Sequence, residues 1–197
     1  MDVRRSKQTG AKMTTASSDL RFQKFNRWFK TADVDDDGLV DRRDFEQYGK
    51  AYAKALGIPP DSDKYQRMVE VSKGVWDLQA PHDHDGTVRM NIEQWIEAAV
   101  AGMQSRRDDY LARASAVADA YFEAADADGT GRLSRDEHSR MLQVTMAVSG
   151  DDARAVFDRM DLDGDGAISR DEFRQGFIDF LSSDDPDAPG NWFFGPL

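Results

Sequence analysis

Apolar and aromatic residues recur at spacings of three or four positions along most of the chain, which is typical of amphipathic helices. The first such segment starts at Ser18 or Asp19, and either residue can cap a helix N-terminus. The recurring apolar positions are Phe22, Phe25, Trp28 and Phe29; Phe45, Tyr48 and Tyr52; Tyr65, Met68, Val69, Val75 and Trp76; Ile92, Trp95, Ile96, Ala99, Val100 and Met103; Tyr110, Leu111, Ala114, Val117, Ala118, Tyr121 and Phe122; Met141 and Leu142; Ala153, Val156, Phe157 and Met160; and Phe173, Phe177, Ile178 and Leu181. The pattern predicts an all-α fold with an aromatic-rich core.

An acidic stretch, residues 161–172, separates the last two of these segments. A loop that wraps calcium takes side-chain oxygens from its first, third and fifth residues and a carbonyl oxygen from its seventh. The ninth residue often acts through water, and the twelfth supplies a bidentate carboxylate. These places hold Asp161, Asp163, Asp165, Ala167, Ser169 and Glu172, with Gly166 at the sharp turn. Crowded carboxylates repel one another unless a divalent cation lies between them, so the stretch predicts a calcium site.

Residues 126–137 repeat this pattern with fewer carboxylates. The corresponding places hold Asp126, Asp128, Thr130, Arg132, Ser134 and Glu137, where Arg132 offers its carbonyl oxygen. Every position that anchors the cation is present. We expect a second calcium site with weaker intrinsic affinity, because fewer ligands carry charge.

Residues 33–44 form a third copy, with Asp33, Asp35, Asp37, Leu39, Asp41 and Asp44 in the same places. Here the twelfth residue is aspartate instead of glutamate. Its shorter side chain favours the six-coordinate geometry of magnesium over bidentate contact with calcium. We therefore expect a divalent cation at this loop, with magnesium as the alternative to calcium.

Residues 81–92 resemble the other copies when they are aligned on Gly86, but the anchoring places are lost. Pro81 and Ile92 then occupy the first and twelfth places, and Arg89 occupies the ninth. We expect this loop to bind no metal. His82 and His84 do not predict a zinc site, because no further nitrogen or sulfur ligands lie nearby.

In this alignment each copy has an aliphatic residue two places after its turn glycine: Val40, Val88, Leu133 and Ile168. Such residues can pair in a short antiparallel bridge between two loops. The loop without metal would then still support its neighbour, since a single helix–loop–helix unit cannot bury its own apolar face.

These loops with their flanking helices resemble a four-hand EF-hand protein over nearly the whole chain. The altered second hand, the aromatic-rich helices and the apolar C-terminal end resemble the calerythrin and sarcoplasmic calcium-binding protein group. The resemblance implies two EF-hand pairs packed into one compact globule, with a calcium-buffering or signalling role. We expect a disordered tail over residues 1–17, an N-terminal pair over 18–104, a C-terminal pair over 105–181 and a packed tail over 182–197.

The negative net charge of the chain favours the binding of cations. Lys and Arg total 26 against 37 for Asp and Glu, a formal net charge of −11. Three divalent cations would bring six positive charges, and −11 + 6 = −5. The acidic balance argues against nucleic acid or an anionic membrane as a partner. The chain has no cysteine, no apolar run near the ~18–20 residues that span a bilayer and no apolar core of a signal peptide, so we expect a cytoplasmic monomer.

Three functions remain after these observations. The first is a buffer or signal modulator that binds about three divalent cations. The second is a calmodulin-like sensor with a protein target, which is less favoured because the 8 methionines are scattered among 11 Phe, 4 Trp and 5 Tyr. The third is a photoprotein-like carrier whose small ligand would lie among Trp28, Trp76, Trp95 and His138. We do not expect an enzyme, since no nucleophile elbow, phosphate loop or zinc signature occurs.

Overall fold

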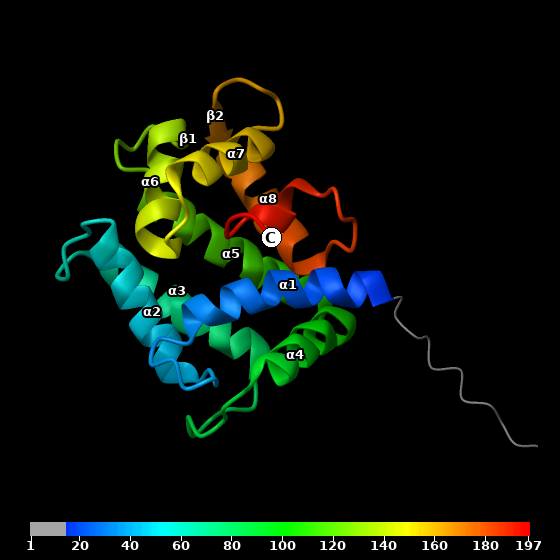
Figure 1. Ribbon diagram of the computed structural model, residues 1–197. Helices are drawn as coiled ribbons and strands as arrows, with labels where there is room; N and C mark the ends of the chain where they lie inside the picture. Colours follow the sequence, from blue (N-terminus) through cyan, green and yellow to red (C-terminus); the bar gives the residue numbers. More distant parts are fainter. Residues whose placement is uncertain (1–14) are drawn as a thin grey trace, which may run out of the picture.

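A computed structural model describes residues 15–197, and within them it confirms the predicted all-α fold with short β-pairing between loops (Figure 1). The helices are α1 (Thr15–Ala32), α2 (Arg42–Ala55), α3 (Asp63–Gln79), α4 (Ile92–Ser105), α5 (Arg107–Ala125), α6 (Arg135–Met146), α7 (Gly150–Met160), α8 (Arg170–Ser182) and the short 3-10 helix η1 (Pro189–Trp192). Strands β1 (Arg132–Ser134) and β2 (Ala167–Ser169) pair antiparallel, with Leu133 opposite Ile168.

One helix boundary differs from the prediction. Helix α1 begins at Thr15, so residues 15–17 are helical; the rest of the expected tail lies outside the described residues. Helices α4 and α5 are separated by Arg106 alone. The Arg106 N–H donates to the Gly102 carbonyl (3.0 Å) and its own carbonyl accepts from the Tyr110 N–H (2.8 Å). One residue therefore ends α4 and starts α5, a capping role that its sequence does not reveal.

A single aromatic core joins both halves of the chain. Figure 1 shows α1 crossing the molecule between α2–α4 and the half that contains α6–α8. From α1, the Trp28 ring contacts Trp95 of α4 (5.3 Å between centroids) and Phe177 of α8 (6.0 Å). Tyr52 of α2 stacks on Tyr121 of α5 (4.9 Å). These contacts make the buried apolar residues of both halves one continuous core.

The C-terminal segment, residues 184–197, folds back over α1 and α8. Phe194 stacks on Trp28 with centroids 5.5 Å apart, and Phe193 lies edge-on to Phe173 at 4.9 Å. Both phenylalanines are buried. The segment therefore covers apolar surface of α1 and α8 that would otherwise face solvent.

Of the helices in the described residues, none combines the length and the apolar character that crossing a membrane requires.

Candidate metal-binding loops

Each acidic loop enters its following helix through a capping box, an exchange of hydrogen bonds that satisfies the first N–H groups of a helix. In the last loop, the Ser169 hydroxyl accepts from the Glu172 N–H (3.2 Å), and the Ser169 N–H donates to Glu172 Oε2 (2.7 Å). The same exchange joins Ser134 to Glu137 and Asp41 to Asp44. Helix formation thus places the twelfth carboxylate of each loop.

The first aspartate holds the turn of its own loop. Asp161 Oδ1 accepts from the Asp165 N–H (3.1 Å), and its Oδ2 accepts from the Gly166 N–H (3.0 Å). Gly166 has a φ of 88°, which glycine adopts without strain. Asp126 and Asp33 make the same two contacts four and five residues ahead.

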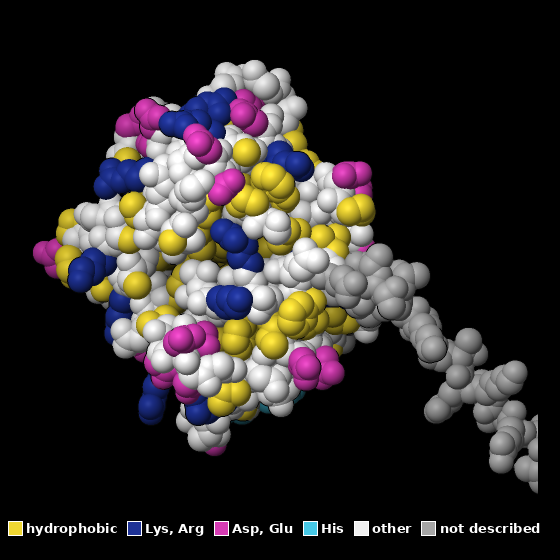
Figure 2. Space-filling view, in the orientation of Figure 1, with side chains coloured by type: hydrophobic (Ala, Val, Ile, Leu, Met, Phe, Trp, Pro, Cys, Tyr) yellow, Lys and Arg dark blue, Asp and Glu magenta, His cyan; other side chains and the backbone are white. Residues whose placement is uncertain are grey.

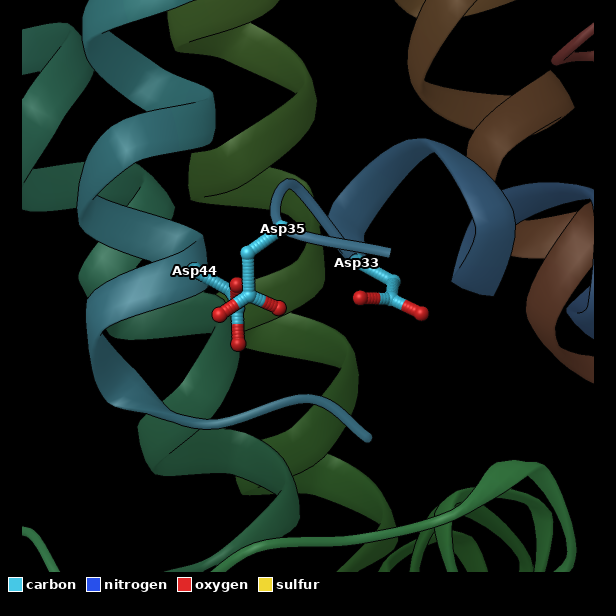
Figure 3. Close-up of side chains that lie close together, drawn as sticks. All are labelled: Asp33, Asp35 and Asp44. Carbon is cyan, nitrogen blue, oxygen red and sulfur yellow. The ribbon is translucent and has the colours of Figure 1, made fainter. Parts of the chain in front are cut away.

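These contacts bring carboxylates from three places in each loop together. In each of the three groups, the ligand oxygens lie within 4.8 Å of one another. The groups are Asp33, Asp35 and Asp44; Asp126, Asp128 and Glu137; and Asp161, Asp163 and Glu172. Figure 3 shows the first group between the end of α1 and the start of α2. All the donors are oxygens, which suit calcium or magnesium and not a thiolate-binding metal.

The twelfth residues differ between the loops. The Leu162 N–H donates to Glu172 Oε1 at 2.8 Å, whereas the matching contact from Val34 to Asp44 Oδ1 is 3.4 Å, as expected for a shorter side chain. Burial opposes ionisation of Glu172, but hydrogen bonds from Ser169 and from loop N–H groups outweigh it and lower the pKa. In contrast, burial raises the pKa of Asp44. The cost of its charge would fall with a cation beside it.

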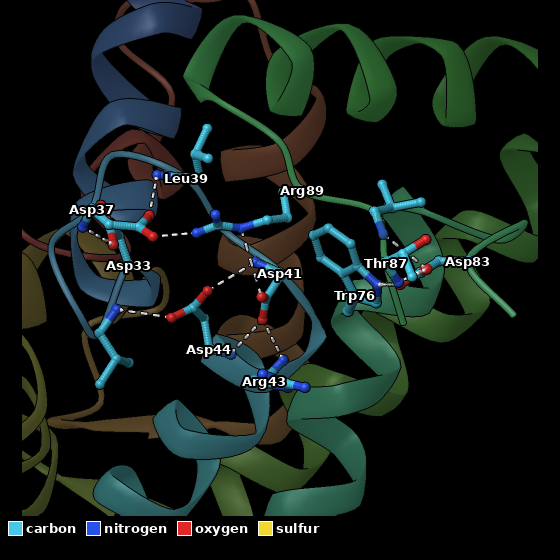
Figure 4. Close-up of polar contacts among 12 residues, drawn as sticks. Asp33, Asp37, Leu39, Asp41, Arg43, Asp44, Trp76, Asp83, Thr87 and Arg89 are labelled. Carbon is cyan, nitrogen blue, oxygen red and sulfur yellow. Dashed lines mark hydrogen bonds and ion pairs between the residues drawn. The ribbon is translucent and has the colours of Figure 1, made fainter. Parts of the chain in front are cut away.

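The fifth-place aspartates lie outside these groups. Asp37 and Asp165, both predicted ligands, instead contact arginines of the neighbouring loops. Asp37 contacts Arg89 (Figure 4), and Asp165 contacts Arg132. The hydrogen bond from Arg89 holds the pKa of Asp37 below its usual value. Sequence reasoning missed both contacts, because each arginine comes from a different loop.

The remaining predicted ligands are in their loops, and several have structural roles as well. Asp41, Ser134 and Ser169 are the N-caps of α2, α6 and α8. The Thr130 hydroxyl donates to the Arg132 carbonyl at 3.1 Å. The seventh-place residue Leu39 precedes the bridge residue Val40, whereas Arg132 and Ala167 lie within the paired strands, opposite Ser169 and Ser134. Their ligand roles stay predictions.

The alignment of the second loop on Gly86 was wrong by two residues. Val40 pairs with Met90 and not with Val88, through N–H to carbonyl contacts of 2.8 and 2.9 Å. Asp83 Oδ1 accepts from the N–H groups four and five residues ahead, at 3.0 and 3.1 Å, as a first-place aspartate does. The second loop is therefore residues 83–94, and we number the four loops 33–44, 83–94, 126–137 and 161–172 as loops 1 to 4.

Gly86 was assigned to the wrong place because each loop has more than one position that suits glycine. An acidic loop of this kind has two left-handed positions, the fourth and the sixth, as Gly164 (φ 71°) and Gly166 (φ 88°) show. Gly86 (φ 70°) occupies the fourth place of loop 2, not the sixth. A lone glycine in the sequence does not distinguish the two places. The hydrogen bonds of Asp83 and the pairing of Met90 with Val40 show that Gly86 is the fourth residue of loop 2.

Loop 2 also begins late. The Ala80 N–H donates to the Trp76 carbonyl, as the Asp33 N–H does to Phe29, so α3 ends where another loop would start. Asp83 follows 83 − 80 = 3 residues later. The Trp76 indole N–H donates to Asp83 Oδ2 at 2.7 Å (Figure 4).

The twelfth place of loop 2 holds neutral Gln94, which caps α4 together with Asn91. An amide in place of the carboxylate and an indole on the first aspartate both support the expectation that loop 2 binds no metal. Among the described residues, the groups of three or more metal-ligand side chains contain no histidine.

Comparison with known proteins agrees with this geometry. A family model described as an EF-hand domain pair matches residues 115–178, and an EF-hand model matches residues 25–47. The sarcoplasmic calcium-binding protein of Perinereis vancaurica tetradentata is 36% identical over 182 residues, which cover 91% of this chain and 99% of the relative. The chain belongs to the EF-hand family of calcium-binding proteins.

Solved structures of other EF-hand proteins share this fold. A calcium-binding protein of Streptomyces coelicolor is 28% identical, with a TM-score of 0.68 over 82% of this chain and 97% of its own. The coelenterazine-binding protein of Renilla muelleri is 25% identical, with a TM-score of 0.68 over 94% of this chain and 100% of its own. This EF-hand protein is thus a calcium-binding protein with three candidate acidic sites.

Proposed function

We propose that this EF-hand protein is a calcium buffer or signal modulator, without catalytic activity, that binds about three divalent cations in loops 1, 3 and 4. The observation that carries the proposal is the covered core. Phe193 and Phe194 lie against α8 and Trp28, over apolar surface that a sensor would offer to its target. A sensor hand must open to expose such a groove. Opening would here break ring contacts shared by both halves.

The proposed cations are calcium at loops 3 and 4, and calcium or magnesium at loop 1. The longer contact of Asp44 supports the distinction, since magnesium accepts a single carboxylate oxygen and keeps more of its waters. We propose a cytoplasmic monomer. The net charge of −11 supports neither nucleic acid nor an anionic membrane as a partner.

Calorimetric titration with calcium, repeated in the presence of magnesium, tests the proposal by counting sites. We expect three sites in the wild-type protein and two in each of Asp44→Asn, Glu137→Gln and Glu172→Gln, because each change removes a twelfth-place charge. Magnesium should compete best at loop 1. Glu93→Gln is the matched control, because Glu93 lies in loop 2 outside its ligand places, and it should leave three sites.

Other counts would assign the loops differently. Four sites would show that loop 2 binds calcium despite Gln94. Two sites that Asp44→Asn leaves unchanged would remove loop 1 from the proposal. No measurable binding would contradict the proposed function as a whole.

A carrier of a small apolar ligand is the second candidate. It is supported by the similarity to coelenterazine-binding protein and by buried polar atoms that lack hydrogen-bond partners within the described part of the chain. These include Trp28 Nε1, Trp95 Nε1 and the Tyr121 hydroxyl. Titration with coelenterazine while tryptophan fluorescence is recorded tests this candidate, and a saturable change would favour it over a buffer.

A further inference from the structure

The corrected numbering of loop 2 reveals a complementary pattern within each pair of loops. Two loops carry threonine at the fifth place and arginine at the seventh, and their partners carry aspartate at the fifth and an aliphatic residue at the seventh. The first kind is loop 2, with Thr87 and Arg89, and loop 3, with Thr130 and Arg132; the second kind is loop 1, with Asp37 and Leu39, and loop 4, with Asp165 and Ala167. Each pair thus combines one loop of each kind.

The arginine of one loop reaches the aspartate of the other. Arg89 Nη2 hydrogen-bonds Asp37 Oδ2, and Arg132 Nη2 hydrogen-bonds Asp165 Oδ2. In each aspartate the second oxygen, Oδ1, accepts from the N–H two residues ahead, at 2.9 Å in loop 1 and 3.1 Å in loop 4. Arg89 Nε also lies 3.9 Å from Asp41 Oδ2. Both oxygens of each fifth-place carboxylate therefore have partners within the protein.

Both arginines occupy equivalent positions relative to the pairing between loops. The eighth residues pair across the loops, Val40 with Met90 and Leu133 with Ile168. In the C-terminal pair, the antiparallel register sets Arg132 opposite Ser169, the ninth residue of loop 4, and the long Arg132 side chain extends from there to the Ala167 carbonyl (3.5 Å) and to Asp165. The arginine comes from the second loop of one pair and from the first loop of the other, so the same contact is built twice from different positions in the chain. Figure 2 shows basic side chains among acidic ones at the end of the molecule where β1 and β2 lie.

We propose that Arg89 and Arg132 are internal cations that compete with calcium for Asp37 and Asp165, and thereby set the affinity of loops 1 and 4. The inference rests on the proposed function of these loops. In the metal-free protein the guanidinium neutralises the carboxylate and ties the two loops together. A calcium ion that takes the carboxylate must displace the guanidinium or share the aspartate with it.

Arg132 has a second connection. Its carbonyl oxygen is at the seventh place of loop 3, a predicted ligand place, while its guanidinium contacts Asp165 of loop 4. One residue therefore links both sites of the C-terminal pair. Arg89 belongs to loop 2, which has no proposed cation. In the N-terminal pair the arginine therefore only competes with the cation of loop 1 for Asp37.

Competition predicts opposite effects on affinity and on metal-free stability. Without the guanidinium, calcium meets an unoccupied carboxylate and binds more tightly. The metal-free protein loses a contact between loops and becomes less stable. If the arginines only oriented the aspartates for calcium, their removal would weaken binding instead.

The test compares Arg89→Gln and Arg132→Gln with wild type by calcium calorimetry and by thermal unfolding in chelator. The ion pairs are about half exposed, so we expect calcium to bind about 2- to 5-fold more tightly at the affected loop. The metal-free unfolding midpoint should fall by about 2 °C. Arg154→Gln is the matched control, because Arg154 pairs with Asp151 within α7 and its removal changes the net charge equally. It should leave both values unchanged.

Arg89→Lys and Arg132→Lys keep the charge and should lie between wild type and the glutamine variants. Glutamine variants that bind calcium as wild type does, or more weakly, would overturn the inference. So would an equal gain in affinity in the Arg154→Gln control, which would assign the effect to net charge instead of competition. A wild-type protein that binds no calcium would instead contradict the proposed function, and this result would be known before any variant is compared.

Discussion

At the scale of a single residue, Lys24 shows how a buried charge holds the chain's end in place. Its ammonium donates to the Ser183 carbonyl (2.7 Å), the Asp179 carbonyl (3.4 Å) and Asn191 Oδ1 (3.2 Å). The two carbonyls belong to the end of α8, where a cation is favourable. Burial lowers the pKa of Lys24 to about 8, although Asp184 and Asp179 oppose the shift. The ammonium still stays charged at pH 7.

The lowered pKa predicts how stability depends on pH. Below pH 8 Lys24 is protonated in both the folded and the unfolded chain, so it adds no pH dependence. Between the folded pKa of about 8 and the unfolded value of 10.5, the unfolded chain binds more protons, and the free energy of unfolding rises with pH. Relative to Lys24→Met, wild type should gain about 2 kcal/mol between pH 7 and pH 10.

Urea unfolding of both proteins in chelator at several pH values measures this gain. Lys50→Met is the control, because Lys50 is more exposed and its ion pair with Glu46 raises its pKa. It should show no such gain. A difference between wild type and Lys24→Met that stays constant with pH would contradict burial as the dominant cause.

At the scale of elements, glycines let η1 approach α8 backbone to backbone. A Cβ on Gly190 would lie 2.3 Å from the Gly176 carbonyl oxygen and 2.5 Å from Asp179 Cβ. Gly176 itself leaves room for Met160 and Phe193. The packing of the C-terminal segment against α8 therefore depends on the absence of side chains at Gly190 and Gly176 as well as on its aromatic rings.

Gly190→Ala should lower the free energy of unfolding by about 1–3 kcal/mol, because the backbone of α8 cannot move away without disturbing its packing. Gly74→Ala in α3 is the control: nothing lies within 4 Å of a Cβ there, and alanine should stabilise the helix by about 0.5–1 kcal/mol. Urea unfolding measures both. Equal effects in the two variants would show that η1 is not packed closely against α8.

At the scale of the whole molecule, the shared aromatic core and the negative net charge determine how calcium changes stability. Trp28 connects α1 with α4, α8 and the C-terminal segment, so neither half can open alone without losing ring contacts. The net charge of −11 is concentrated in part on loops whose carboxylates repel one another without a cation. Calcium should therefore stabilise the closed molecule.

We expect saturating calcium to raise the thermal unfolding midpoint without increasing the binding of an apolar fluorescent dye. Phe194→Ala is the positive control, because it uncovers Trp28 and should increase dye binding with or without calcium. Dye binding that rises when calcium is added to wild type would favour the sensor. An unfolding midpoint that calcium leaves unchanged would contradict the buffer as well.

The sequence by itself determined the helices and the places of loops 1, 3 and 4. Helices depend on local apolar spacing, and the first and twelfth residues of a loop act through hydrogen bonds that span at most ten residues, such as those of Asp161 and Glu172. The predicted oxygen ligands therefore follow a fixed local spacing, which the sequence displays directly.

Only the tertiary structure decided the rest. The numbering of loop 2 depends on its pairing with Val40, because Gly86 alone suits either left-handed place. The contacts of Arg89 with Asp37 and of Phe194 with Trp28 join residues distant in the chain. Such contacts form only when separate helices pack together, and no local spacing encodes which partners will meet.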